Sequence, residues 1–172
     1  MTQVACKPSK SESLQQLALC LEAQDQAAKI YNKRNTYLDV FVKEARVDKY
    51  GNSLDNVHKI KEESKSIADF QKFWLDKLNS TKNRFKDKEL INRTIDFLIA
   101  GQNLEEELNH FMVLWQDSII DNEEESAIKI NEVARELKAR ESILNTTKSE
   151  FFERYNVSQK EVDSILEVIR AD

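Results

Sequence analysis

The chain has almost none of the residues that interrupt helices. Among its 172 residues, proline occurs once, at Pro8, and glycine twice, at Gly51 and Gly101. Helix interiors exclude proline because it removes a backbone donor, and they disfavour glycine because it raises the entropy of the unfolded chain. The sequence therefore predicts an all-α protein built from long helices. Two isolated glycines also exclude a glycine-rich phosphate-binding loop.

Residues that carry chemistry are equally scarce. Two cysteines, Cys6 and Cys20, are too few for a disulfide framework, and the two histidines form no nucleophile motif with them. Glu107 and His110 match the Glu-x-x-His spacing of di-iron bundles, but His110 projects away from the apolar stripe of its helix. We therefore expect no enzymatic activity, no metal and no cofactor.

Long apolar runs are absent too. The longest apolar runs, residues 17–21 and 111–115, like residues 97–100, are far too short to span a bilayer, so we expect no membrane insertion. Hydrophobic residues make up 40% of the chain and charged residues 33%, with both signs mixed. This composition is typical of long, solvent-washed helices. We expect a cytoplasmic protein, with the cytoskeleton or the nucleus as alternatives.

Capping signals and apolar spacings of three and four divide the chain into helices. We expect a flexible N-terminus over residues 1–8 and a single helical domain over residues 9–172. A turn at residues 48–53 separates the first two helices, and a polar loop at residues 79–87 precedes the third. A break near Asp121 separates the third helix from the fourth, although these two could also run on as one. The fold class is thus an elongated antiparallel helical bundle or coiled coil of four long helices plus a short C-terminal helix, which a capping box at residues 158–161 introduces.

Polar residues interrupt the apolar seams. In a coiled coil such residues fix register and partner, whereas in a globular bundle they need hydrogen-bond partners. A third interpretation places them at the edge of the bundle. Gly101 also lies in an apolar stripe, where the missing side chain permits a close helix crossing or a kink. The polar seam residues are Gln24, Asn35, Ser64, Gln71 and Arg140.

Charge is distributed unevenly between consecutive helices. Residues 53–88 contain nine Lys/Arg and six Asp/Glu, whereas residues 89–125 contain one Lys/Arg and ten Asp/Glu. Opposite charge favours pairing of these helices as an antiparallel hairpin. The simplest interpretation of the charges is a solvated surface. Alternatively, the acidic triplets bind a basic partner, or the basic residues 72–88 contact nucleic acid or another acidic polymer, although nucleic acid is disfavoured by the small excess of charge.

These features favour a non-enzymatic structural subunit of a multi-protein coiled-coil assembly, of the cytoskeletal, spindle/kinetochore or tethering type. It would act through helix–helix pairing with other helical proteins in a hetero-oligomer, without a small-molecule substrate. The alternative is a self-contained four-helix binding module, of the adaptor, chaperone or immunity type, that uses an acidic face to bind a basic partner. The candidate partner-binding residues are Leu14, Leu17, Leu21, Tyr31 and Leu38 on the first seam, and Glu105, Glu106, Glu107, Glu123, Glu124 and Glu125 on the acidic face.

Overall fold

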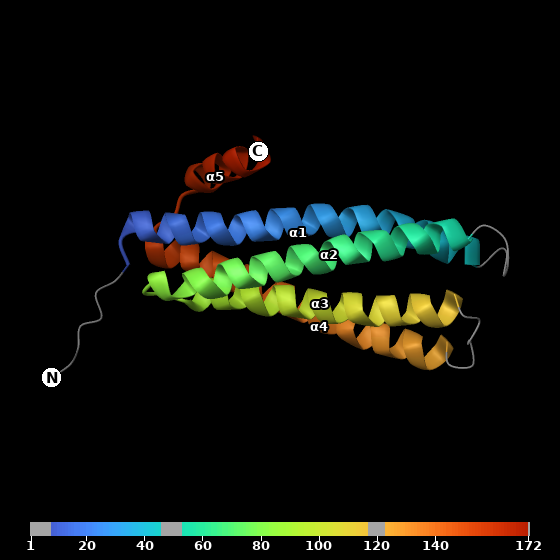
Figure 1. The fold of residues 1–172 in the computed structure, drawn as a ribbon. Coiled ribbons are helices and arrows are strands. Elements are labelled where there is room, and N and C mark those ends of the chain that lie inside the picture. Colours follow the sequence, from blue (N-terminus) through green and yellow to red (C-terminus); the bar gives the residue numbers. More distant parts are fainter. Residues whose placement is uncertain (1–7, 46–52, 117–122, 172) are drawn as a thin grey trace.

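The computed structural model is an all-α helical bundle, as the sequence predicts. It describes residues 8–45, 53–116 and 123–171, with side chains for residues 8–40, 57–113 and 125–171. Four long helices lie alongside one another, and a short fifth helix lies beside the N-terminal part of the first (Figure 1). The elements are α1 (Lys10–Ala45), α2 (Ser53–Thr81), the 3₁₀ turn η1 (Lys82–Arg84), α3 (Glu89–Gln116), α4 (Glu123–Tyr155) and α5 (Gln159–Ala171).

The expected helix boundaries agree with this architecture only in part. Residues 79–81 of the expected polar loop belong to α2 and residues 82–84 form η1, so the connection without helix is limited to residues 85–88. Helices α3 and α4 are separate and packed against each other, which excludes a single continuous helix. The turn at residues 48–52, the break around Asp121 and nearly all of the expected flexible segment 1–8 lie outside the described residues. None of the described helices is long and apolar enough to cross a membrane.

Residues 9–12 have the sequence of a capping box, which predicts a helix start there. Helix α1 does begin at this point, but the capping box is only half formed. Ser9 Oγ accepts a hydrogen bond from the backbone N–H of Glu12 at 3.1 Å. The Glu12 carboxylate does not return to Ser9; it accepts from the backbone N–H of Lys86 at 2.8 Å. Glu12 therefore ties the connection between α2 and α3 to the start of α1, because that connection offers a free backbone donor.

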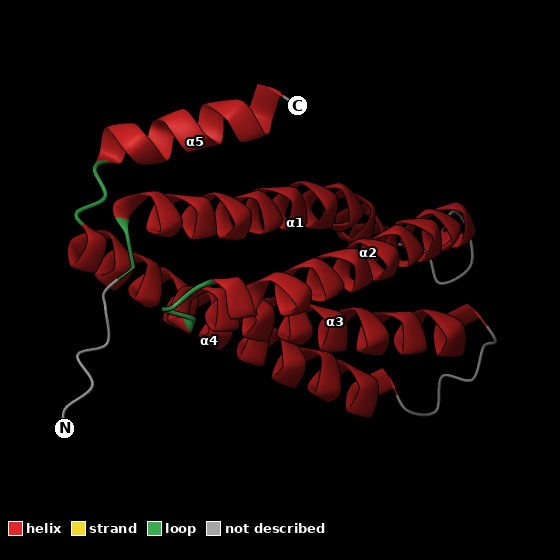
Figure 2. Cartoon of the chain, turned by 60° about the vertical axis from the view of Figure 1, so that its left-hand side comes forward, coloured by secondary structure: helices red, strands yellow, loops and turns green. Residues whose placement is uncertain are grey.

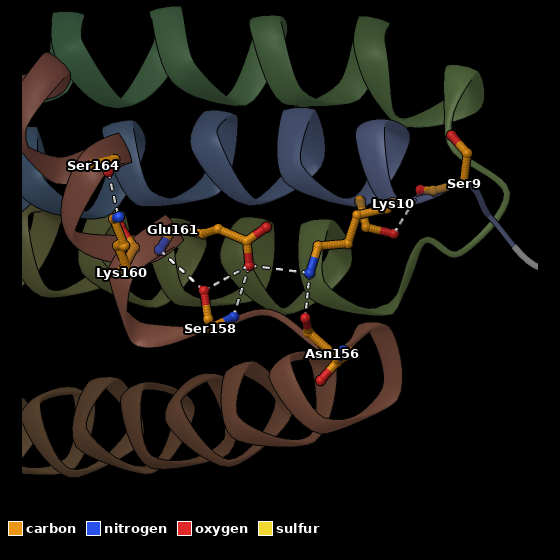
Figure 3. Close-up of polar contacts among 8 residues, drawn as sticks. Ser9, Lys10, Asn156, Ser158, Lys160, Glu161 and Ser164 are labelled. Atoms are coloured by element: carbon orange, nitrogen blue, oxygen red, sulfur yellow. Dashed lines mark hydrogen bonds and ion pairs between the residues drawn. The ribbon is translucent and has the colours of Figure 1, made fainter.

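Two complete local motifs join α4 to α5. Asn156 has a positive φ of 51°, and the N–H of Val157 donates to the carbonyl of Phe152 at 2.9 Å, which closes α4 in a left-handed cap. The capping box at the start of α5 is then formed in both directions, by Ser158 N–H to Glu161 Oε2 at 2.8 Å and Glu161 N–H to Ser158 Oγ at 3.3 Å (Figure 3).

One lysine joins this corner to the start of α1. Lys10 Nζ lies 3.0 Å from Glu161 Oε2 and also donates to the backbone carbonyl of Asn156 (Figure 3). Near the other end of α5, Arg170 Nε lies 3.2 Å from Asp25 Oδ1 of α1. Ion pairs at both ends, with buried Val162 between them, therefore hold α5 against α1.

The buried apolar side chains form two clusters along the bundle. Among the described side chains, the first cluster draws on all five helices and the second on α1, α2 and α3. All five helices thus contribute to the core at the end where α1 begins and α4 ends. The first cluster includes Leu17, Cys20, Leu21, Trp74, Leu78, Leu90, Ile91, Leu98, Leu144, Phe151 and Val162. The second consists of Val57, Ile60 and Met112, with Tyr37, Leu38 and Phe111 packed against it.

Three acidic residues of α3 form ion pairs with α1 and α4. Glu105 pairs with Arg34 of α1, and Glu107 lies 2.8 Å from Lys129 of α4. Glu89 lies 3.2 Å from Arg154 of α4. Helices α2 and α3 do pack as consecutive antiparallel neighbours, but these ion pairs connect α3 to the other two long helices.

We predict that the attachment of α5 weakens in acid. The backbone N–H of Ser158, followed by Lys10 and the Ser158 hydroxyl, lowers the pKa of Glu161 from 4.5 to about 2. A carboxyl group whose pKa is depressed by folding stabilises the folded state above its unfolded pKa. That contribution should be lost as the pH falls from about 4.5 to about 2.

Amide hydrogen exchange along α5 measures this effect. Protection should decrease over that pH window in the parent chain, and Glu161→Gln should remove the pH dependence. Glu167→Gln on the same helix is the matched control, because Glu167 has no ion pair within the described residues. Equal behaviour of the two variants would contradict a specific role for Glu161.

Candidate interaction groove

Helix α4 is buried over its second half and open over its first. Leu144, Thr147 and Phe151 are buried, whereas no side chain between residues 125 and 143 is. Ile130, Val133 and Leu137 follow one another at spacings of three and four, which predicts an apolar seam in this half of α4, but all three are only half-buried. Both views show α4 following α3 while it diverges from α1 towards its N-terminus (Figures 1 and 2). A space lined by residues of α1, α3 and α4 lies where these helices diverge.

This space is a groove of ≈ 370 Å³. Three helices form it, and its lining combines apolar side chains from all three with amide side chains from α1 and α4. A largely apolar surface with a few fixed polar groups is the usual composition of a binding site. The lining residues are Gln24, Ala28, Tyr31, Asn32, Arg34 and Asn35 of α1, Phe97 and Leu104 of α3, and Leu137, Glu141, Leu144 and Asn145 of α4.

A buried ion pair lies at the wall of the groove, where Arg34 is a lining residue. Arg34 Nη2 lies 2.8 Å from Glu105 Oε1, and Arg34 Nη1 donates to Glu105 Oε2 at 3.1 Å. Ser64 Oγ of α2 donates to the same Oε2 at 3.1 Å. Only 3% of each charged side chain is exposed. Burial raises the pKa of Glu105, and the Arg34 guanidinium and the Ser64 hydroxyl act in the opposite direction.

A second buried contact lies beside it and depends on a glycine. Gln71 Nε2 donates to the Tyr31 hydroxyl at 2.7 Å. A Cβ atom at Gly101 would overlap that hydroxyl and lie 3.2 Å from Gln71 Nε2. The missing side chain at Gly101 therefore allows Tyr31 of α1 and Gln71 of α2 to lie close to the backbone of α3, as the position of this glycine in the apolar stripe predicts. Burial raises the pKa of Tyr31 to about 12, so its hydroxyl keeps its proton at neutral pH.

The predicted seam residues of α1 lie in different surroundings. Leu17 and Leu21 are buried in the first cluster, and Leu38 packs against the second. Leu14 is half-buried and lines an apolar hollow beneath α5, together with Ala18 and Ile165. Only Tyr31 of this set lines the groove. The internal contacts of Leu17 and Leu21 show that this part of the seam closes within the chain.

The predicted acidic face is also divided. Glu105 lies inside the bundle and not on a surface, because it is the partner of buried Arg34. Glu107 is half-buried in its pair with Lys129, whereas Glu106 and Glu125 are exposed. The side chains of Glu123 and Glu124 lie outside the described residues.

Four of the five polar seam residues lie at the groove or in the layer behind it, whereas Arg140 pairs with Glu136 of the same helix at 2.6 Å. Ser64 and Gln71 are buried and both donate hydrogen bonds, as a globular bundle requires, but Gln71 Oε1 has no partner among the described residues. Gln24 and Asn35 line the groove at the two ends of a weakly apolar stretch of α1 that includes Ala28. Sequence reasoning missed Phe97, Leu137 and Asn145 as groove residues. The sequence did contain one indication of the groove. Residues 24–35 of α1 have too few apolar side chains to bury a fourth helix.

No metal site accompanies the groove. Both histidines, His58 and His110, are exposed. Within residues 8–45, 53–116 and 123–171, no group of three or more His, Cys, Asp or Glu side chains is placed to hold a metal ion.

No protein-family model, curated protein or solved structure matches the chain. The fold and the groove define its class: an all-α helical bundle with one open side.

We predict that removing one member of the buried ion pair destabilises the chain strongly. Arg34→Met or Glu105→Gln should each lower the free energy of unfolding by about 3–5 kcal/mol, because each leaves an uncompensated buried group. The double variant Arg34→Met/Glu105→Met should recover most of that loss. Urea denaturation followed by circular dichroism measures all three.

Lys33→Met is the matched control for this series. Lys33 belongs to the same helix and lies 2.6 Å from Glu63, but its side chain is 62% exposed. An exposed ion pair contributes about 0–1 kcal/mol, so the control should change little. Equal losses of unfolding free energy for Arg34→Met and Lys33→Met would show that water reaches the Arg34–Glu105 pair.

We predict that Gly101→Ala destabilises the parent chain but not a chain that lacks the Tyr31 hydroxyl. In a free helix this change is favourable by about 1 kcal/mol. Here the new methyl group overlaps Tyr31 Oη, which should reverse the sign and cost about 1–3 kcal/mol. In the Tyr31→Phe background the colliding atom is gone, so most of that cost should disappear. Thermal unfolding of the four chains of this cycle tests the coupling, and an equal cost in both backgrounds would refute it.

Proposed function

We propose that the protein is a non-enzymatic helical interaction module that binds a helix of another protein in the groove between α1 and α4. The single observation that carries this proposal is the half-buried apolar seam of α4. Leu137 keeps the spacing of a helix–helix contact, but it is only half-buried and lines the groove, although α4 packs along α3. A partner helix would complete that contact.

The length of the groove suits a helical ligand. Its lining runs from Gln24 to Asn35 along α1, a distance of about 16 Å in an α-helix. Two to three turns of a partner helix would fit along it. Such a ligand presents apolar residues at spacings of three and four, which is the usual pattern of helix-in-groove recognition.

The internal packing supports a self-contained module. Both apolar clusters and the buried polar layer are completed by this chain's own residues. This favours an independently folded binding module over a chain that needs a partner to fold. The two sequence-based hypotheses then merge: a self-contained bundle serves as a subunit of a larger helical assembly of the cytoskeletal, spindle/kinetochore or tethering type, in the cytoplasm.

The acidic face stays a second candidate surface because Glu106 and Glu125 are exposed. Charge reversal at these two residues separates the hypotheses. It should leave a groove partner bound and release a partner that recognises the acidic face.

We predict that Leu137→Lys abolishes partner binding. A photo-crosslinking residue at position 28, on the groove side of α1, should first capture the partner covalently. Binding of that purified partner, measured by calorimetry, should weaken at least about tenfold with Leu137→Lys, because the charge replaces an apolar anchor. The melting temperature should change little because Leu137 is only half-buried.

Ile128→Lys is the matched control. Ile128 lies on the same half of α4, is 54% exposed and does not line the groove. Its replacement should leave the affinity unchanged. Equal effects of the two substitutions, or no effect of Leu137→Lys, would refute the groove as the binding site.

A further inference from the structure

Helix α5 is only loosely packed against the bundle. Within α5, whose residues 159–171 the structure describes, only Val162 is buried. This helix lies on the outer side of α1, which is the helix that it contacts most (Figures 1 and 2). Between the two helices lies a hollow of ≈ 690 Å³, and its lining includes Leu14 and Ala18 of α1 and Ile165 of α5. The contact between α5 and α1 therefore lacks the close packing of a protein interior.

The corner that joins α4 to α5 is short and contains no residue that excludes a helix. Only residues 156–158 separate the two helices, and neither proline nor glycine occurs among them. Asn156 turns the chain with a φ of 51°, a left-handed conformation that asparagine tolerates but that glycine adopts more readily. Right-handed helical angles at these three residues would instead join α4 and α5 into one helix.

The apolar seam keeps its register through this corner. Six positions from α4 to α5 follow one another at alternating spacings of four and three, as on one face of a single helix. Five of them belong to the first apolar cluster or pack against it, and only Ser158 in the corner is polar. A bend between two independent helices imposes no such register. The six positions are Phe151, Tyr155, Ser158, Val162, Ile165 and Ile169.

We propose that the corner straightens and that α5 then packs on α1 of a second copy of the chain, which forms a domain-swapped dimer. The occupant of the vacated face of α1 is chemically identical to the helix that left it, so the contacts between α1 and α5 form again between two chains. Lys10 with Glu161 and Asp25 with Arg170 supply opposite charges at the two ends of that contact in either arrangement. Short connections between packed elements favour this kind of exchange.

The corner itself decides between the closed chain and the dimer. The closed chain keeps the Ser158–Glu161 capping box and the hydrogen bonds that Val157 N–H and Lys10 Nζ donate to backbone carbonyl groups (Figure 3). The straightened chain replaces these by the hydrogen bonds of a continuous helix and releases Asn156 from its left-handed conformation. Because two copies must associate, a higher protein concentration shifts the balance towards the dimer.

The groove between α1 and α4 takes no part in this exchange. Its lining on α4 ends at Asn145 and includes no residue of α5. The inference therefore stands or falls independently of the proposed function.

Two substitutions at Asn156 should shift the balance in opposite directions, as sedimentation equilibrium measures. Glycine favours the left-handed turn and disfavours a helix, whereas alanine does the reverse. We expect a monomer–dimer equilibrium for the parent chain. Each dimer contains two corners, so Asn156→Ala should raise the association constant roughly tenfold or more, and Asn156→Gly should lower it by a similar factor.

Asn92→Ala is the matched control for helix propensity. Asn92 is an exposed asparagine inside α3, where no turn depends on it. This substitution should leave the association constant unchanged. An equal rise for Asn92→Ala and Asn156→Ala would overturn the role of the corner.

Photo-crosslinking separates a swapped dimer from a dimer formed through another surface. A photo-crosslinking residue replaces Ala18, which lines the hollow beneath α5. Isotope-labelled and unlabelled chains are mixed in denaturant and refolded, and the dimer is isolated before illumination. In a swapped dimer, about half of the crosslinks between α1 and α5 should join a labelled to an unlabelled peptide. In any other dimer, each such crosslink lies within one chain and carries one label.

Opposite shifts of the association constant at position 156 together with crosslinks of mixed label would support the swapped dimer. Crosslinks without mixed label would overturn it, even where a dimer forms. Equal association of Asn156→Ala and Asn156→Gly, or a parent chain and an Asn156→Ala chain that both stay monomeric at their highest soluble concentration, would overturn it as well.

Discussion

The arrangement of the first three helices depends on the buried pair of Arg34 and Glu105. The pair lies between the two apolar clusters and joins α1 to α3, while Ser64 adds α2 to the same group. Apolar side chains tolerate a shift of one turn along a helix, because one leucine replaces another at little cost. A charged pair does not, since a shift would leave both charges buried and uncompensated at a cost of several kcal/mol. The ion pair therefore specifies one alignment of the three helices, and the Tyr31–Gln71 contact over Gly101 specifies it again one layer away.

The same layer explains why α4 is incompletely packed. Tyr31 and Arg34 of α1 use their side chains in the buried polar contacts with Gln71 and Glu105. The neighbouring seam positions of α1 are Ala28 and Asn35. Such a stretch offers little apolar surface to a fourth helix. Helix α4 accordingly packs along α3 and meets the common core only from Leu144 onwards. The groove is thus a consequence of the polar layer: residues that fix the alignment of three helices are unavailable to bury the fourth.

Much of the fold could be predicted from local sequence, but little of the site could. The caps at Ser9 and Ser158 and the shortage of proline and glycine depend on neighbours within a few residues, and these predictions are confirmed. Glu105 looks like one member of an exposed acidic triplet, because no local pattern reveals an arginine 71 positions earlier in the chain. The groove depends on the angle between α1 and α4, which is set by contacts across the whole bundle. Periodicity identified the seams correctly, but it does not specify which seam meets which helix.

The polar side chains of Gln24 and Lys148, where α1 meets α4, lower the stability of the free chain. Leucine or methionine at these positions would remove the cost of a buried, unpaired amide and a half-buried amine. In the free bundle, these polar groups therefore reduce stability. Ser64 and Gln71 differ from them, because their hydrogen bonds hold helices in alignment.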